Sequence, residues 1–187
     1  MPSRAEIWQA LYGAWRFARF DRNAIHYFDL SHRGVWRSFW AAALSYPGFL
    51  LLRWLELDDQ TLADSSIGHI FLVETIGDIV GWCAFPLVVL GLCRWLGRED
   101  RGFDFIAAYN WSVVLQVAFF IVVGLVSLAL PAGMALGLGR IALIAMLVYE
   151  WFIALVAIGA GGAIAGVIVV IDVVLSTFIV LVTESLY

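Results

Sequence analysis

The chain has 187 residues and a formal net charge of −4, and 63% of its residues are hydrophobic while only 14% are charged. Soluble domains are about 45–50% apolar and about 25% charged, so a soluble domain of this length could not bury so much apolar surface. The composition therefore excludes a soluble domain and indicates an integral membrane protein.

The first 34 residues are predicted to form a cytoplasmic amphipathic segment, because they contain no continuous apolar run. On a projection of about 100° per residue, apolar side chains and tryptophans gather on one arc, as in a helix at the membrane interface. Such a helix could lie among lipid headgroups, form a floor beneath the bundle, or dock a protein partner, and the first two roles are compatible. The residues expected at this interfacial or partner-binding surface are Trp8, Leu11, Trp15, Arg16 and Arg19.

Five apolar stretches are each close to the roughly 20 residues that a helix needs to cross a bilayer. They cover residues 35–54, 71–95, 105–130, 137–158 and 163–183. Short breaks at Pro131 and at 159–162 predict that the last three stretches form antiparallel hairpins. The sequence therefore predicts an all-α fold, in which residues 35–187 are a polytopic bundle of five transmembrane helices behind an N-terminal interfacial helix.

Small residues spaced four apart suggest where helices approach one another closely. The pairs are Gly77 and Gly81, Gly133 and Gly137, and Gly162 and Gly166. Such pairs permit close helix packing within the chain and would also permit a homo-oligomer.

The arginines predict the orientation, since basic residues concentrate on the cytoplasmic side of a membrane. Nine of the eleven fall on one side of a five-span bundle, and only Arg53 and Arg140 fall on the other. The nine are Arg4, Arg16, Arg19, Arg22, Arg33, Arg37, Arg94, Arg98 and Arg101. We therefore expect a cytoplasmic N-terminus and an outside C-terminus, in a bacterial inner (cytoplasmic) membrane.

Ionisable residues inside membrane spans are costly and often functional. Counted from the 159–162 turn at about 1.5 Å per residue, Glu150 and Asp172 both reach the bilayer centre, and Gln116 is expected at a similar depth. The three could form a proton or cation site, in which the carboxyl groups share a proton or bind Na⁺. They could instead be protonated groups that join helices by hydrogen bonds, or pair with arginines of a partner subunit.

The remaining membrane charges have candidate partners at matching depth. We expect Arg53 to pair with Asp78 in the outer half of the bundle, and Glu74 to pair with Arg140 near the outer interface. Both pairings rest on depth alone, because the sequence does not say which helices are neighbours.

Enzymatic motifs are missing from the sequence. His26, His32 and His69 flank the spans without metal-ligand spacing, and no zinc-protease, nucleophile-elbow or phosphate-loop motif occurs. We expect no metal site, no cofactor and no enzymatic activity. Nucleic-acid binding is not expected either, because topology explains the cytoplasmic arginines.

Three segments resemble the Yip-type membrane proteins and their bacterial relatives. They are Gly34–Phe39, Phe105–Trp111 and the transition from Trp151 through Ala165. The resemblance implies a cytoplasmic N-terminal segment followed by five packed spans, and a membrane-organising or trafficking-type interaction protein. Tyr109 is followed by Asn110 where the family has a Gly-Tyr-Gly-like signature, so no functional residue is carried over.

The expected function is that of a non-enzymatic integral membrane protein that binds partners or lipids, as an accessory subunit or membrane-organising protein. Its contact surface would be the N-terminal helix and the connection to the first span. The alternative is a small proton- or cation-coupled transporter or channel that uses Glu150, Asp172 and Gln116. Five spans are few for a transporter, so the alternative requires a homo-oligomer.

Overall fold

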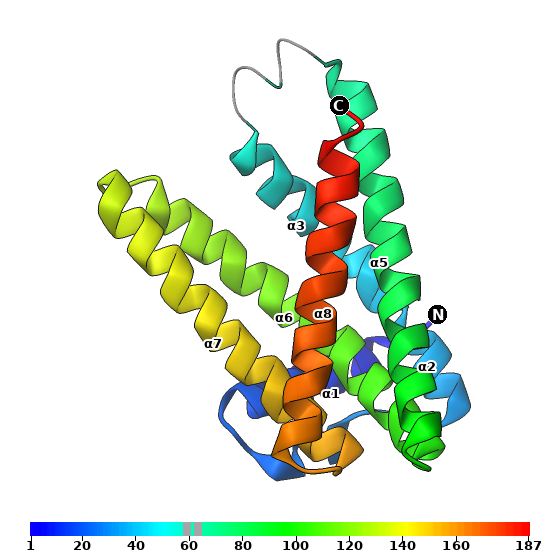
Figure 1. Cartoon of the computed structure of the whole chain (residues 1–187). Coiled ribbons are helices and arrows are strands. Elements are labelled where there is room, and N and C mark those ends of the chain that lie inside the picture. The colour runs from blue at the N-terminus through cyan, green and yellow to red at the C-terminus, as the bar shows by residue number, and fades with distance from the viewer. Residues whose placement is uncertain (58–60, 62–64) are drawn as a thin grey trace.

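The computed structural model describes residues 1–57, 61 and 65–187, and every regular element within this part of the chain is a helix. The elements are α1 (Arg4–Ala18), a 3₁₀ helix η1 (Arg22–Tyr27), α2 (His32–Ser38), α3 (Trp40–Glu56), α5 (Ile67–Trp95), α6 (Glu99–Ser127), α7 (Ala132–Ile158) and α8 (Gly162–Glu184). Figure 1 shows the long helices running between two ends of the molecule, with α1 and α2 gathered at one end. The all-α prediction is confirmed.

Four of the described helices, α5 to α8, are long and apolar enough to cross a membrane, which supports the membrane class. The prediction of five spans is wrong. The first predicted span, 35–54, is divided at Phe39 into α2 and α3. Because α3 has 17 residues, it is about 25 Å long, less than the ~30 Å hydrocarbon core. It also contains Pro47 and ends with Arg53 and Glu56.

At the end of the molecule that holds α1, which we call the α1 end, the turn between α5 and α6 caps the end of α7. Gly159 ends α7 at φ 65° and Gly161 precedes α8 at φ 94°, both in the left-handed region that glycine adopts most easily. The Arg98 guanidinium, from the α5–α6 turn, donates to the carbonyl oxygens of Ile158 (3.1 Å) and Gly159 (3.0 Å). These bonds satisfy carbonyl groups that the end of α7 would otherwise leave unpaired.

Helix α1 packs across the bundle at the α1 end. Its buried face consists of Ala10, Gly13, Ala14 and Phe17, while Trp8 and Trp15 stay exposed. The Tyr149 hydroxyl of α7 donates to the Ala14 carbonyl oxygen at 2.9 Å. The buried face of α1 therefore differs from the apolar arc predicted from the sequence, because that arc includes the two exposed tryptophans.

Helix α6 is the central element, since it packs against α1, α2, α3, α5 and α7. Away from the α1 end, the α6–α7 hairpin diverges from α5 and α8, as Figure 1 shows. Helices α5 and α8 remain in contact along this part.

The predicted glycine contacts form only in part. A Cβ atom at Gly77 would lie 2.5 Å from Thr183 Cγ2, so α5 and α8 approach most closely there. A Cβ atom at Gly81 would make ordinary contact with Ile179, at 3.8 Å. A Cβ atom at Gly133, Gly137 or Gly166 would meet nothing within 4 Å.

A Gly77→Ala substitution is expected to destabilise the protein by about 1–3 kcal/mol, because the added methyl group overpacks the α5–α8 contact. Gly91→Ala is the matched control, since a Cβ atom at that position of α5 meets nothing within 4 Å. Unfolding in mixed detergent micelles, followed by circular dichroism, measures both changes. Equal effects of the two substitutions would contradict the assigned contact.

Candidate functional site

A groove with a volume of about 770 Å³ lies between α3, α5, α6 and α8. It is partly open, and its walls are mostly apolar. Wall residues include Phe49 and Leu52 of α3, Phe85 of α5, Phe120 of α6, and Leu175 and Ile179 of α8. Ligand sites in proteins are commonly concave, largely apolar and about 300–1,000 Å³ in volume, so this groove is the candidate site.

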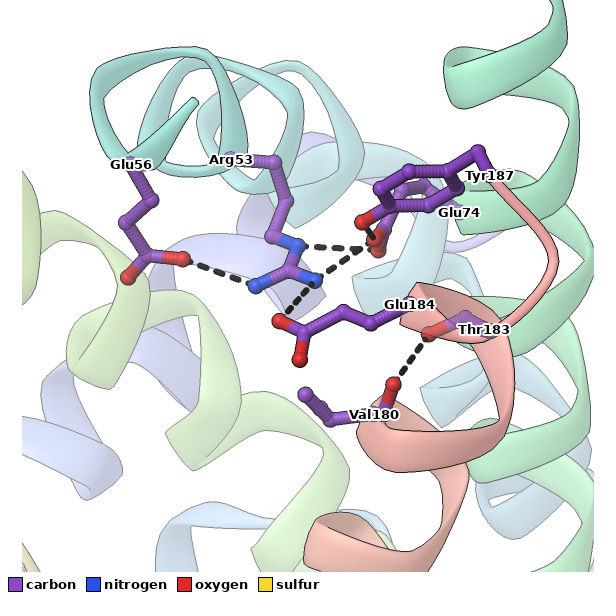
Figure 2. Close-up of polar contacts among 7 residues, drawn as sticks. All are labelled: Arg53, Glu56, Glu74, Val180, Thr183, Glu184 and Tyr187. Atoms are coloured by element: carbon purple, nitrogen blue, oxygen red, sulfur yellow. Dashed lines mark hydrogen bonds and ion pairs between the residues drawn. The ribbon is translucent and has the colours of Figure 1, made fainter. Parts of the chain in front are cut away.

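A group of charged residues and one tyrosine lies at the end of the groove far from α1, as Figure 2 shows. We call it the ion cluster, and it consists of Arg53, Glu56, Glu74, Glu184 and Tyr187. Arg53 donates to Glu74 through Nε (2.8 Å to Oε2) and Nη2 (2.5 Å to Oε1), a two-point ion pair. Glu74 is only 4% exposed, and it also accepts a hydrogen bond from the Tyr187 hydroxyl at 2.6 Å. Glu56 and Glu184 lie at the solvent side of the same guanidinium, at 2.8 Å and 3.4 Å.

Tyr187 lies beyond the end of α8, and its phenol is a stable donor. Burial raises the pKa of Tyr187 to about 12, and its hydrogen bond to the Glu74 carboxylate acts in the same direction. The hydroxyl therefore stays protonated across the neutral range and continues to donate to Glu74.

Both ion pairs predicted from depth are wrong. Arg53 pairs with Glu74 instead of Asp78, which lies one helical turn further along α5. Glu74 therefore pairs with Arg53 and not with Arg140. Arg140 is exposed and forms no ion pair with another described residue. The reason is the lateral arrangement of the helices. The side chains of Arg53, Glu74 and Glu184 reach one another from α3, α5 and α8, whereas α7, which carries Arg140, diverges with the α6–α7 hairpin.

The deep end of the groove, which we call the floor, contains Tyr109, Asn110 and Asp172. The Tyr109 hydroxyl donates to Asp172 Oδ2 at 3.2 Å. Glu150 lies beside Asp172, close enough for the two carboxyl groups to interact. Glu150 is buried, and its Oε1 atom has no hydrogen-bond partner among the described residues.

The structure thus brings Glu150 and Asp172 together but does not bring Gln116 to them. Gln116 lies seven residues beyond Tyr109 on α6, about 10 Å along the axis, and its amide nitrogen is buried without a described partner. Sequence reasoning missed Tyr109 and Asn110 as site residues. The signal was present, since both are polar-tipped residues about ten positions inside α6, level with Glu150.

The orientation of the Asn110 amide follows from its partner, Ser38. The Ser38 hydroxyl donates to the Val35 carbonyl oxygen (2.7 Å), so it has to accept from Asn110 Nδ2 (2.9 Å). Asn110 is completely buried, and its Oδ1 atom is left without a partner among the described residues. The floor therefore contains a buried hydrogen-bond acceptor for which the described part of the chain supplies no donor.

The predicted interfacial residues of α1 separate into two groups. Trp8 and Trp15 are exposed, and the Arg19 guanidinium lies 4.9 Å from the centre of the Trp15 ring. Leu11 instead packs against the core, and Arg16 is engaged by Asp21 and by the Tyr27 hydroxyl.

Two carboxylates hold α1 in place. The Ser3 amide holds the pKa of Glu6 below its usual range, and Arg37 of α2 donates to the same carboxylate at 2.5 Å. The Asn23 amide and Arg16 similarly lower the pKa of Asp21. Both carboxylates therefore remain ionised at neutral pH, and they fix both ends of α1.

Comparison with known proteins gives no relative: no family model, no curated protein and no solved structure matches the chain. The resemblance to the Yip-type proteins therefore stays a prediction. Among the described residues, no group of three or more His, Cys, Asp or Glu side chains is placed to hold a metal ion. The candidate site is thus defined by its own geometry alone.

Arg53→Met is expected to destabilise the protein by about 3–5 kcal/mol, because the Glu74 carboxylate stays buried without its cation. Glu74→Met should cost less, because Arg53 keeps Glu56 and Glu184, and the double variant should lose less than the sum. A double-mutant cycle on the free energy of unfolding measures the coupling.

Glu56→Gln is the control for this cycle, because the Glu56 side chain is 63% exposed and its bridge to Arg53 should contribute at most about 1 kcal/mol. Additive losses from the two single substitutions would contradict a coupled, buried pair.

Proposed function

We propose that this chain is a non-enzymatic integral membrane protein that binds a lipid-like amphipathic molecule in the groove. The observation that carries the proposal is the combination of long apolar walls with polar groups at both ends of one cavity of about 770 Å³. An apolar chain would replace the missing side-chain contacts of the walls. A polar headgroup would find partners at the ion cluster or at the floor.

The proposed location is a bacterial inner membrane, with the α1 end on the cytoplasmic side. Arg98, Arg101 and most of the arginines before α3 gather at or beside this end, as the preference of basic residues for the cytoplasm requires. Exposed Trp8 and Trp15 of α1, together with Arg19, form a surface that suits anionic lipid headgroups. The same surface could dock a protein partner, and a homo-oligomer is compatible with the proposal.

Filling the groove should displace its occupant. Gly81 of α5 lines the groove, and a Cβ atom there makes only ordinary contact, so Gly81→Phe is expected to fold and to occupy the cavity. Native mass spectrometry of protein purified gently from membranes should detect a bound amphiphile in the unsubstituted chain and a loss of it in this variant.

Gly91→Phe is the matched control, because Gly91 is an exposed position of the same helix outside the groove lining. Equal retention of the amphiphile by both variants, or no bound molecule in the unsubstituted protein, would contradict the proposal.

A second candidate function is proton-coupled transport of the bound molecule. It is favoured by one observation: Asp172 lines the groove while it contacts Glu150 behind it. Two adjacent carboxyl groups in a low-dielectric site can share a proton and release it in coupled steps. The carboxyl pair could release its proton when the ligand binds at the groove floor and take a proton up again when the ligand leaves.

Glu150→Gln is expected to abolish the uptake of the groove-bound amphiphile that a pH gradient drives in proteoliposomes. The variant should still insert and bind the amphiphile. Glu99→Gln, an exposed position at the start of α6, is the control and should transport normally. Unchanged uptake in the Glu150 variant would exclude the carboxyl pair from transport.

A further inference from the structure

The groove is lined by more acidic than basic residues. One is basic, Arg53, and four are acidic: Glu56, Glu74, Asp78 and Asp172. The Arg53 guanidinium is already engaged by Glu74 and Glu56, so it has little capacity left to attract an anion. The lining as a whole therefore favours positive charge.

The two aspartates have no positive charge beside them among the described residues. Neither Asp78 nor Asp172 forms an ion pair with another described residue, and both are half-buried in membrane-spanning helices. Asp172 accepts from the Tyr109 hydroxyl and lies beside the Glu150 carboxyl group, and Asp78 lies beside the Trp82 indole of its own helix. These neighbours are neutral or acidic, so none of them brings a positive charge to either aspartate.

A separate observation at the groove floor also favours a positively charged ligand. Asn110 is among the residues that line the groove, and its side chain is completely buried. Ser38 holds its amide nitrogen, while its Oδ1 atom has no partner among the described residues. A buried acceptor without a donor costs free energy, which a ligand that supplies a donor or a positive charge would recover. An anion would instead face both this oxygen and the Asp172 carboxylate.

We infer that the groove selects a cationic amphiphile, an organic ammonium group attached to an apolar body, with the ammonium group at the Asp172–Asn110 floor. This inference rests on the proposed function and specifies its ligand class. Asp172 and Glu184 of the ion cluster are twelve residues apart on α8, about 18 Å along the axis. The apolar body lies along this length, against Phe85, Leu175 and Ile179.

The test uses three photoactivatable amphiphiles that share one diazirine-bearing alkyl chain. Their headgroups are trimethylammonium, a neutral oligoethylene glycol, and sulfonate. The full chain in lipid nanodiscs is labelled over a range of concentrations, and labelled peptides are mapped by mass spectrometry. Saturable labelling of the groove walls by the ammonium probe, at about tenfold or more lower concentration than the other two, is the expected result.

Substitutions identify which carboxylate gives the preference for the ammonium probe. Asp172→Asn should weaken labelling by the ammonium probe about tenfold and leave labelling by the neutral probe unchanged. Asp104→Asn, the same chemical change on α6 outside the groove lining, should alter neither. If the Asp172 variant does not fold, Asp78→Asn takes its place, with a loss of preference for the ammonium probe expected there too.

Equal labelling by all three probes would overturn the inference while it supports an amphiphile-binding groove without charge selection. Preference for the sulfonate probe would overturn it as well. Absence of saturable groove labelling by any probe would overturn both the inference and the proposed function.

Discussion

The buried ion pair between Arg53 and Glu74 is the constraint on which the arrangement of the long helices depends. A charge removed from water is costly unless an opposite charge and hydrogen bonds satisfy it, so these two side chains have to meet. Their meeting links the end of α3 to the first turns of α5 through side chains. Glu184 and Tyr187 extend the cluster to the end of α8, so three chain segments that are far apart in sequence converge at one point.

The α1 end is held by a different kind of interaction. There, aromatic and small side chains of α1 fill the space beneath α6 and α7, and hydrogen bonds from Tyr149 and Arg98 satisfy backbone carbonyl groups. Toward the far end, α6 still packs against α3, where a Cβ atom at Gly124 would contact Leu55 at 3.6 Å, but the ion cluster includes no residue from α6 or α7. The divergence of the α6–α7 hairpin from α5 and α8 leaves the groove, with an acceptor at its floor that has no partner among the described residues and with the ion cluster at the far end.

The candidate site could be found from the sequence where a tight turn fixes the residue count. Glu150 and Asp172 flank the 159–162 turn at similar distances, so their common depth followed from the helical rise alone. Gln116 was placed at that depth by counting from residue 105, where the apolar stretch begins. Helix α6 begins at Glu99, so the count was short by six residues, or about 9 Å, and Tyr109 and Asn110 occupy the expected level.

The sequence by itself determined the membrane class, the helical fold, the hairpins at Pro131 and 159–162, and the level at which two carboxyl groups lie. These follow from composition, from the length of apolar runs and from the fixed rise of a helix, all of which are local properties of the chain. The tertiary structure decided that α3 is too short to count as a span, that Arg53 meets Glu74, and that Asn110 keeps an unpaired oxygen beside a groove. Depth along one axis cannot give these results, because lateral neighbours depend on how whole helices pack.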